Sequence, residues 1–242
     1  MITTSYEGDL LRGDENCMRV GLCGKAFWWA MMSTYVLSTF KVRSTLWRIN
    51  QIIRIFKCPM MRKLAHDEIA SRRQTLEALH DVKRLPVSVV LDNVRSIYNV
   101  GSIFRTSDGA MIERLYLCGY TPHPPRKEIE KTALGATQSV PWEYRQSPRE
   151  QILELRAKHV KICALELTTH SIPYYKIARE DFPLCLVVGN ELTGISKELL
   201  ELADLAIEIP MFGIKQSLNV AVAYGIALFE LSRICRSTNQ QP

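Results

Sequence analysis

Residues 184–191 read Leu-Cys-Leu-Val-Val-Gly-Asn-Glu, and this stretch decides the fold class. Five consecutive apolar residues are followed directly by glycine, asparagine and glutamate. An apolar run without alternation is typical of a strand covered on both faces, as in a parallel sheet flanked by helices. Similar β-rich runs occur at residues 87–91, 115–118, 160–165 and 205–209. The sequence therefore predicts an α/β protein with a mostly parallel sheet.

Helical patterns alternate with these runs, as the crossover connections of a parallel sheet require. They fall at residues 101–108, 148–158, 196–202 and 217–236, and an earlier one covers residues 61–80. No long linker, low-complexity tract or internal repeat interrupts the chain after residue 61. We therefore expect a helical segment at residues 61–86, followed by one compact domain at residues 87–238.

The first 60 residues do not resemble the rest of the chain. Their apolar run, Ala26 to Phe40, is shorter than the roughly 20 residues that a membrane-spanning helix needs, and it lacks a convincing cleavage site for secretion. Three interpretations remain: an interfacial or buried helix, a poor targeting segment, or sequence that is not part of the natural product. We favour the last, because regular periodicity begins only at Met61. We expect residues 1–60 to be dispensable and the protein to have no membrane partner.

Charge and cysteine content narrow the class of protein. The net charge is +6, but the first 60 residues hold eight Lys/Arg against four Asp/Glu, so any nucleic-acid binding by the main domain must come from local patches. The seven cysteines form no C-x-x-C pair and no His/Cys cluster at metal-ligand spacing. This pattern predicts reduced thiols, a cytoplasmic location and no metal.

Polar residues follow three of the apolar runs, at the edge of a parallel sheet where ligands gather. The first group is Asn99-Val-Gly-Ser-Ile-Phe-Arg105. A helix beginning near Gly101 places the Asn99 carboxamide at its mouth, and Arg105 can grip a phosphate and orient an oxygen nucleophile. The alternative is an ordinary N-capped helix in which Arg105 pairs with Asp108 or Glu113.

The second group is Val188-Gly-Asn-Glu191, with Gly194 close behind it. Glycine at the end of a strand allows a ligand to approach the backbone closely. The alternative is a simple joint between a strand and a helix capped by Ser196. Neither the G-x-G-x-x-G fingerprint nor a P-loop is present, which disfavours a dinucleotide or a nucleoside triphosphate.

The third group joins Ile209-Pro-Met211 to Ser217-Leu-Asn-Val220, which opens a long apolar helix. Taken singly, Ser217 or Asn219 can be a helix cap and Met211 can be part of the core. These alternatives do not predict the combination, in which three glycine- or asparagine-bearing turns occur at the same kind of joint between strand and helix.

Together the three groups resemble the SpoU, or TrmH-like, 2′-O-ribose RNA methyltransferases of the SPOUT class, over about residues 85–236. Asn99, Gly101 and Arg105 match the N-x-G-x-x-x-R motif of that family. The second motif is matched by G-N-E followed by Gly194, and the third includes the S-L-N-V core. Ala221 stands where many members have serine, which leaves the catalytic set intact.

The resemblance implies a Rossmann-like α/β fold with a C-terminal trefoil knot that holds S-adenosyl-L-methionine, and it implies a homodimer. Small residues of the last helix, Ala221, Ala223, Gly225 and Ala227, can serve either a dimer interface or ordinary core packing. The implied catalytic residues are Asn99, Arg105, Glu191 and Asn219. The implied cofactor-binding residues are Leu165, Gly189, Asn190, Gly194, Ile209, Met211, Ser217 and Leu218. The implied substrate is structured RNA, with tRNA favoured.

RNA requires positive charge at the rim of the site. The predicted RNA-binding residues are Arg72, Arg73, Arg126, Lys127, Lys131 and Lys215, although each taken alone is more typical of a solvated surface charge. Three alternatives stay open: the same reaction on rRNA, base methylation, and a catalytically silent RNA-binding protein of the same fold. The Asn99/Arg105 pair argues against base methylation, and the intact catalytic set argues against a silent protein.

Overall fold

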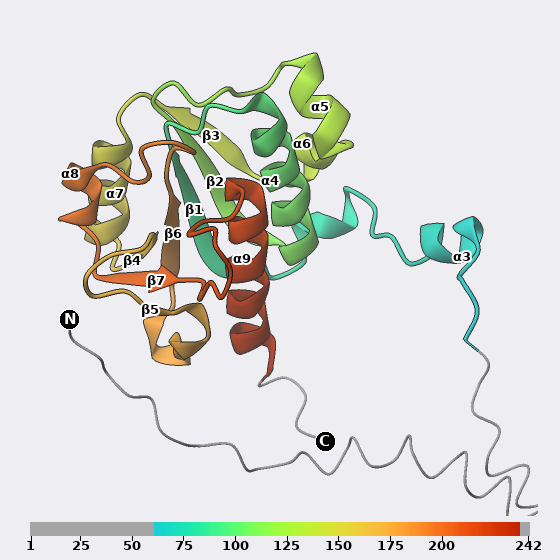
Figure 1. The fold of residues 1–242 in the computed structure, drawn as a ribbon. Helices are drawn as coiled ribbons and strands as arrows, with labels where there is room; N and C mark the ends of the chain where they lie inside the picture. Colours follow the sequence, from blue (N-terminus) through green and yellow to red (C-terminus); the bar gives the residue numbers. More distant parts are fainter. Residues whose placement is uncertain (1–60, 238–242) are drawn as a thin grey trace, which may run out of the picture. The chain divides into compact units, whose positions relative to one another are not determined.

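This computed structural model describes residues 61–237, and a seven-stranded sheet forms the core of the unit that begins at Arg72 (Figure 1). The strands run in the order β3-β2-β1-β6-β4-β7-β5, and every pair of neighbours is parallel. Their bounds are β1 Leu85–Asp92, β2 Ile112–Cys118, β3 Trp142–Arg145, β4 Lys161–Leu165, β5 Ile172–Pro173, β6 Leu184–Val188 and β7 Leu205–Glu208. The prediction of a mostly parallel α/β sheet is confirmed.

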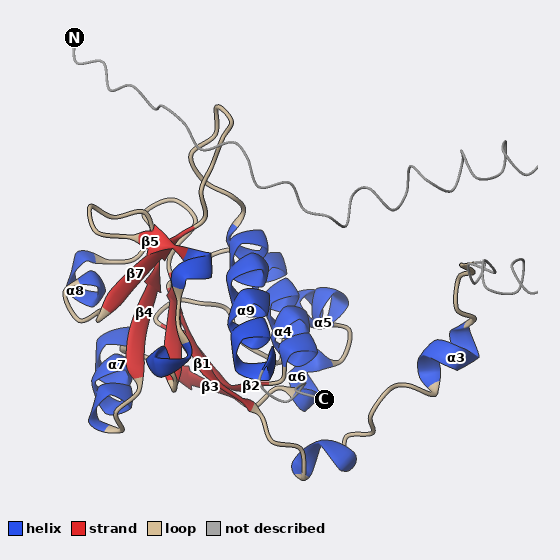
Figure 2. Ribbon diagram, turned by 90° about the horizontal axis from the view of Figure 1, so that it is seen from below, coloured by secondary structure: helices blue, strands red, loops and turns tan. Residues whose placement is uncertain are grey.

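Helices cover both faces of the sheet, which gives three layers (Figures 1 and 2). One face carries α4 (Ile97–Ala110), α5 (Lys127–Ala133), α6 (Ala136–Ser139) and α9 (Val220–Arg236). The other face carries α7 (Pro148–Ala157) and α8 (Lys197–Leu200). Because every pair of neighbouring strands is parallel, the carboxyl ends of all seven strands lie along one edge of the sheet.

The central strands are buried on both faces, which explains their unbroken apolar sequences. Val89 of β1 pairs with Leu115 of β2 on one side and with Leu186 of β6 on the other, and all three are fully buried. Full burial of one such side chain contributes about 1.5–3 kcal/mol relative to exposure. In the helical layer that contains α4 and α9, the hydroxyl groups of Ser107 (α4) and Tyr224 (α9) share a buried 2.7 Å hydrogen bond. The two helices that flank the candidate site are therefore fixed to each other.

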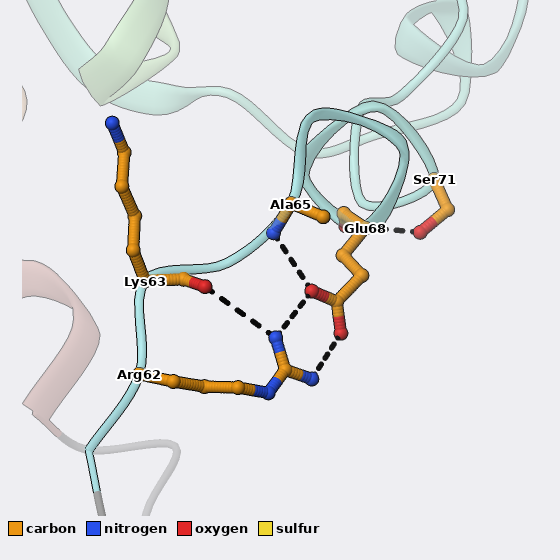
Figure 3. Close-up of polar contacts among 5 residues, drawn as sticks. All are labelled: Arg62, Lys63, Ala65, Glu68 and Ser71. Atoms are coloured by element: carbon orange, nitrogen blue, oxygen red, sulfur yellow. Dashed lines mark hydrogen bonds and ion pairs between the residues drawn. The ribbon is translucent and has the colours of Figure 1, made fainter.

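The predicted helix at residues 61–80 is wrong. The chain there forms only α3 (His66–Ala70) and the single-turn helix η3 (Ala78–His80). The Glu68 carboxylate accepts a hydrogen bond from the Ala65 backbone and binds both terminal nitrogens of Arg62 (Figure 3). Within residues 61–237 the apolar side chains of Ile69 and Leu76 are exposed and do not support a longer helix by packing. Isolated helices shorter than roughly 12–15 residues are marginal in water.

Other differences concern short elements and boundaries. The compact unit begins at Arg72, and the first strand begins at Leu85. The strands β3 and β5 and the helices α5 and α6 were not predicted, because each has seven residues or fewer and no long apolar run. The expectations for residues 1–60 lie outside the described residues.

Three cysteines lie in the strands of the sheet. Cys118, Cys163 and Cys185 are fully buried in strands, and burial raises the pKa of each thiol, to about 12 for Cys118. Thiols with raised pKa values react poorly because the thiolate is the reactive form.

In the described part of the chain, no helix has the length and apolar character needed to cross a bilayer.

Candidate functional site

A cavity of about 890 Å³ opens at the carboxyl ends of β4, β6 and β7. It is lined by the residues that follow these three strands and by the connection from β7 to α9. The eight residues predicted to bind the cofactor all line it: Leu165, Gly189, Asn190, Gly194, Ile209, Met211, Ser217 and Leu218. The second and third sequence motifs therefore build one site.

A hydrogen-bonded chain of three side chains lies at one side of this cavity. The Asn99 amide nitrogen donates to Glu191 Oε1 at 2.8 Å, and the Asn219 amide nitrogen donates to Asn99 Oδ1 at 3.2 Å. Glu191 and Asn219 line the cavity, and Asn99 connects them from α4. All three motifs thus meet in one network.

Glu191 also organises the start of α4. Its carboxylate accepts hydrogen bonds from the backbone nitrogens of Arg95 and Ser96, at 2.8 and 2.9 Å. Burial by itself raises the pKa of this carboxyl group, but these two bonds and the one from Asn99 outweigh it, so the pKa is lowered. Glu191 is therefore held in its charged form.

The helix caps differ in part from those predicted. Helix α4 begins at Ile97 with Ser96 as its cap, so Asn99 lies inside the first turn and its side chain is free for Glu191 and Asn219. Asn219 does cap α9, accepting from the backbone nitrogens of Ala221 and Val222, while its amide group donates to Asn99. Asn219 therefore both caps α9 and takes part in the side-chain network. Ser217 is not a helix cap.

The loop after β6 folds back on itself, and this fold, rather than the approach of a ligand, requires glycine at position 189. Asn190 and Gly194 exchange two backbone hydrogen bonds, and the Asn190 side chain makes four more, within the loop and to Asn93 and Tyr120. A Cβ on Gly189 would lie 2.3 Å from backbone atoms of Gly194 and Ile195. The close approach at Gly189 is thus made by the chain's own backbone.

Two carboxylates of the cavity were missed from the sequence. Glu166, directly after β4, accepts from the backbone nitrogens of Ile195 and Leu167, and Glu208 at the end of β7 accepts from the Ser171 hydroxyl. Their position in the sequence could have identified them as site residues, because both stand at the carboxyl end of a predicted strand. Together with Glu191 they give the cavity three carboxylates against one cation, Lys215.

Arg105 occupies a different position from the rest of the predicted catalytic set. Its side chain is exposed on α4, outside the lining of the cavity, and it makes no hydrogen bond or ion pair with residues 61–237. The alternative pairing with Asp108 or Glu113 is absent, since Asp108 accepts from Ser139 instead. Among the residues that the structure describes, Arg105 is therefore an exposed cation without a partner.

The predicted RNA-binding cations are all exposed, and none of the six forms an ion pair within the described residues. Lys215 lines the cavity, while Arg126, Lys127 and Lys131 lie at and within α5. Arg72 and Arg73 begin the compact unit. The structure brings only Lys215 directly to the cavity.

Known proteins match the part of the chain that carries the three motifs. A profile described as the SpoU rRNA Methylase family matches residues 86–229. The chain belongs to this family. A tRNA (guanosine(18)-2′-O)-methyltransferase of Aquifex aeolicus is 35% identical over 166 residues, which cover 68% of this chain and 77% of that protein. The family predicted from the three motifs is therefore confirmed.

Solved structures of SpoU proteins share the fold. The tRNA modifying enzyme TrmH/SpoU of Aquifex aeolicus aligns with a TM-score of 0.61 and 34% identity, covering 68% of this chain and 84% of that one. An AdoMet-bound rRNA methyltransferase from Sinorhizobium meliloti aligns with a TM-score of 0.58 and 27% identity, covering 77% of each chain. The trefoil knot remains a prediction that this SpoU fold implies.

Proposed function

We propose that this SpoU-family protein transfers a methyl group from S-adenosyl-L-methionine to a ribose 2′-hydroxyl of RNA, with tRNA as the favoured substrate. The observation that carries the proposal is the Glu191–Asn99–Asn219 network at the side of an acidic cavity. Two amide groups and a carboxylate, fixed by one another, are suited to orienting a hydroxyl nucleophile.

The cavity fits the cofactor in size and in charge. A volume of about 890 Å³ lies in the range of roughly 300–1,000 Å³ that is common for small-molecule sites. Glu166, Glu191 and Glu208 favour a cation such as a sulfonium and disfavour the phosphates of NAD or ATP. Backbone groups and apolar side chains around Leu165, Gly189, Ile209 and Leu218 would hold the cofactor, with Asn190, Gly194, Met211 and Ser217 completing the walls.

The chain's own residues would then prepare the hydroxyl group. S-adenosyl-L-methionine supplies an electrophilic methyl group when bound. A ribose hydroxyl is a weak nucleophile and must be held in line while it loses its proton. Asn99 and Asn219 would orient the ribose, and Glu191 would fix Asn99. Arg105 would bind the RNA phosphate and assist removal of the proton, since its guanidinium group has no partner within the described residues.

RNA would reach the site across exposed positive charge. Lys215 stands at the cavity, and Arg126, Lys127 and Lys131 provide a second group near α5. Arg72 and Arg73 belong to the segment at residues 61–86, which we propose as an additional RNA-contacting element preceding the methyltransferase domain at residues 87–238. The buried, reduced cysteines support a cytoplasmic location for this work.

The choice between tRNA and rRNA rests on relatives. The relative from Aquifex aeolicus is named as a tRNA methyltransferase, and its higher identity favours tRNA. The aligned Sinorhizobium meliloti protein is titled an rRNA methyltransferase, so rRNA is the second candidate. The catalytic network is compatible with either substrate, because the ribose is common to both.

A homodimer is part of the proposal, and α9 supports it differently from what the sequence suggested. Ala227 is buried in the core and Gly225 faces Thr106 of α4, so these small residues serve packing within the subunit. The exposed face of α9 instead carries large apolar side chains: Val222, Ile226 and Phe229. A second copy would cover this stripe. Phe229→Asp should then lower the mass measured by light scattering from dimer to monomer.

The reaction is tested by methyl incorporation. Purified protein is incubated with radiolabelled S-adenosyl-L-methionine and either bulk tRNA or bulk rRNA, and the modified nucleotide is mapped. We expect label in tRNA on a ribose 2′-oxygen. In parallel, S-adenosyl-L-methionine should raise the melting temperature while NAD and ATP should not. Stabilisation by NAD alone, or label on a base, would contradict the proposal.

A further inference from the structure

Aromatic side chains gather beside the site, at the carboxyl ends of β2 and β3. Tyr120 follows β2, Tyr144 lies in β3, and His123 belongs to the loop after β2. Tyr120 is 62% exposed and Tyr144 is 42% exposed. Large aromatic side chains are usually buried for their apolar area, so two exposed rings near a predicted RNA site require an explanation.

These rings form a continuous arrangement that starts in the core. Buried Phe104 meets Trp142 edge to face at 6.2 Å between ring centroids. His123 stacks on Trp142 at 6.4 Å and contacts Tyr144 at 4.7 Å. The exposed end of the arrangement is therefore supported from below by packed side chains.

Hydrogen bonds fix the orientation of each exposed ring. The Tyr144 hydroxyl donates to the Gly119 carbonyl at 2.9 Å, and the Tyr120 hydroxyl accepts from the Asn190 amide at 2.9 Å. His123 Nδ1 lies 2.9 Å from the Pro124 carbonyl, which can only accept, so this nitrogen carries the proton. Rings held in this way lose little conformational entropy when a planar ligand stacks on them.

The arrangement is linked to the cavity and is flanked by positive charge. Asn190 lines the cavity and bonds directly to Tyr120. Arg95 lies on the adjacent loop after β1, and Arg126 and Lys127 follow His123 in the chain; all three are exposed and form no ion pair within residues 61–237. Glu143 points to the opposite face of β3, where it pairs with Arg145.

We propose that Tyr120, His123 and Tyr144 form a stacking surface for an unpaired base of the RNA, next to the nucleotide whose ribose is methylated. Exposed aromatic rings beside free arginine and lysine side chains are the usual chemistry for binding single-stranded RNA, because every base has a π-face and every nucleotide a phosphate. The inference rests on the proposed function, and it adds a base-binding subsite that contacts neither the cofactor nor the acceptor hydroxyl.

The test uses Tyr144, which does not line the cavity. Tyr144→Ala should weaken binding of a fluorescent oligouridylate by roughly 5- to 100-fold, as loss of one stacking ring does elsewhere. It should raise KM for the RNA substrate by a similar factor, while kcat and the Kd for S-adenosyl-L-methionine stay near the wild-type values. Tyr144→Phe keeps the ring and should retain most of the affinity. Tyr175→Ala, which removes an exposed ring on another element, should change neither quantity.

Photocrosslinking gives an independent readout. An oligouridylate carrying 5-iodouridine should crosslink to Tyr120, His123 or Tyr144 when irradiated with the full-length protein, and mass spectrometry locates the adduct. Wild-type binding by Tyr144→Ala, or adducts confined to other residues, would overturn the subsite even if methyl transfer is normal. Crosslinks at these rings in a protein that methylates no RNA would instead retain the subsite and refute the proposed reaction.

Discussion

Asn99 and Arg105 belong to the same motif and the same helix, yet their surroundings are opposite. The Asn99 side chain is held by Glu191 on one side and by Asn219 on the other. Arg105, six residues later and about 9 Å further along the helix axis, is exposed and forms no hydrogen bond within the described residues. Within residues 61–237, the Asn99 side chain is fixed by its neighbours and the Arg105 side chain is available for another partner.

This difference separates a side chain that the fold already positions from one whose hydrogen-bonding groups stay available within the described residues. A preorganised network costs no reorganisation when the substrate binds, which is the condition for effective positioning. A free guanidinium group keeps its full hydrogen-bonding capacity for a phosphate. The exposed apolar stripe of α9 lies beside the face of α4 that carries Arg105. Phe229 of this stripe lies 3.6 Å from where a Cβ of Gly109 would be, and Gly109 stands one helical turn after Arg105.

The largest effect is expected for Arg105→Ala. Methyl transfer should fall by about 10²–10⁴-fold, the usual contribution of a group that assists proton transfer. The free energy of unfolding should change by less than about 0.5 kcal/mol, since the side chain removed is exposed and has no partner within residues 61–237. Arg105→Lys keeps the charge without the planar fork and should be intermediate. Near-normal turnover of the alanine variant would remove Arg105 from the mechanism.

Glu191→Gln should damage both stability and turnover. The carboxylate accepts from two backbone nitrogens and from Asn99, and the amide group of glutamine places a donor against these donors. We expect a loss of about 1–3 kcal/mol in the free energy of unfolding. Turnover should fall on the order of 100-fold, because Asn99 loses its position. Glu198→Gln, at an exposed ion pair with Arg149, is the matched control and should be nearly silent.

The stability difference caused by Glu191→Gln should depend on pH. The pKa of Glu191 is lowered in the folded protein, so its stabilising effect is fully present above the unfolded value of about 4.3 and is lost as the pH falls through the folded value. Denaturant unfolding of both proteins should show a constant difference from pH 7 to about 5 and a shrinking difference below about 4. A difference that grows on acidification would contradict the assigned hydrogen bonds.

The smallest effect is expected for Asn219→Asp. Aspartate keeps the acceptor that caps α9 but cannot donate to Asn99, so stability should stay within about 0.5 kcal/mol while turnover falls about tenfold. Asn219→Ala should lose both roles and about 1 kcal/mol of stability. Chemical denaturation and methyl-transfer rates measured on the same preparations separate the two roles. Normal turnover of the aspartate variant would leave Asn219 as a cap only.

The sequence predicted the central sheet well because burial on both faces leaves an unbroken apolar run. The runs at 87–91 and 184–188 became β1 and β6, and the residues after them became the site. Gly101 illustrates what could not be predicted. A Cβ there would lie 2.6 Å from the Ile129 carbonyl of α5, a helix that the sequence did not reveal. Its need for glycine comes from a neighbour distant in sequence.

The same limit applies to the site. Asn99 was placed at the mouth of a helix beginning near Gly101, but the helix begins at Ile97 with Ser96 as its cap, and only the fold shows that Asn99 meets Glu191 and Asn219. The helix predicted at residues 61–80 failed for the opposite reason, since Ile69 and Leu76, two of its periodic apolar residues, are exposed among the residues that the structure describes. Periodicity predicts an element, and packing decides whether it persists.

The connection between Asn99 and Asn219 also has a consequence during protein synthesis. Asn219 stands 120 positions after Asn99 in the chain, and α9, which it caps, is the last helix that the structure describes. A nascent chain that has released β1, α4 and β6 from the ribosome already holds Glu191 and Asn99, but not Asn219. Parallel strands that pair far apart in sequence also form slowly. The hydrogen bond between Asn219 and Asn99 therefore cannot form until residue 219 has left the ribosome, so this network is completed only at the end of synthesis.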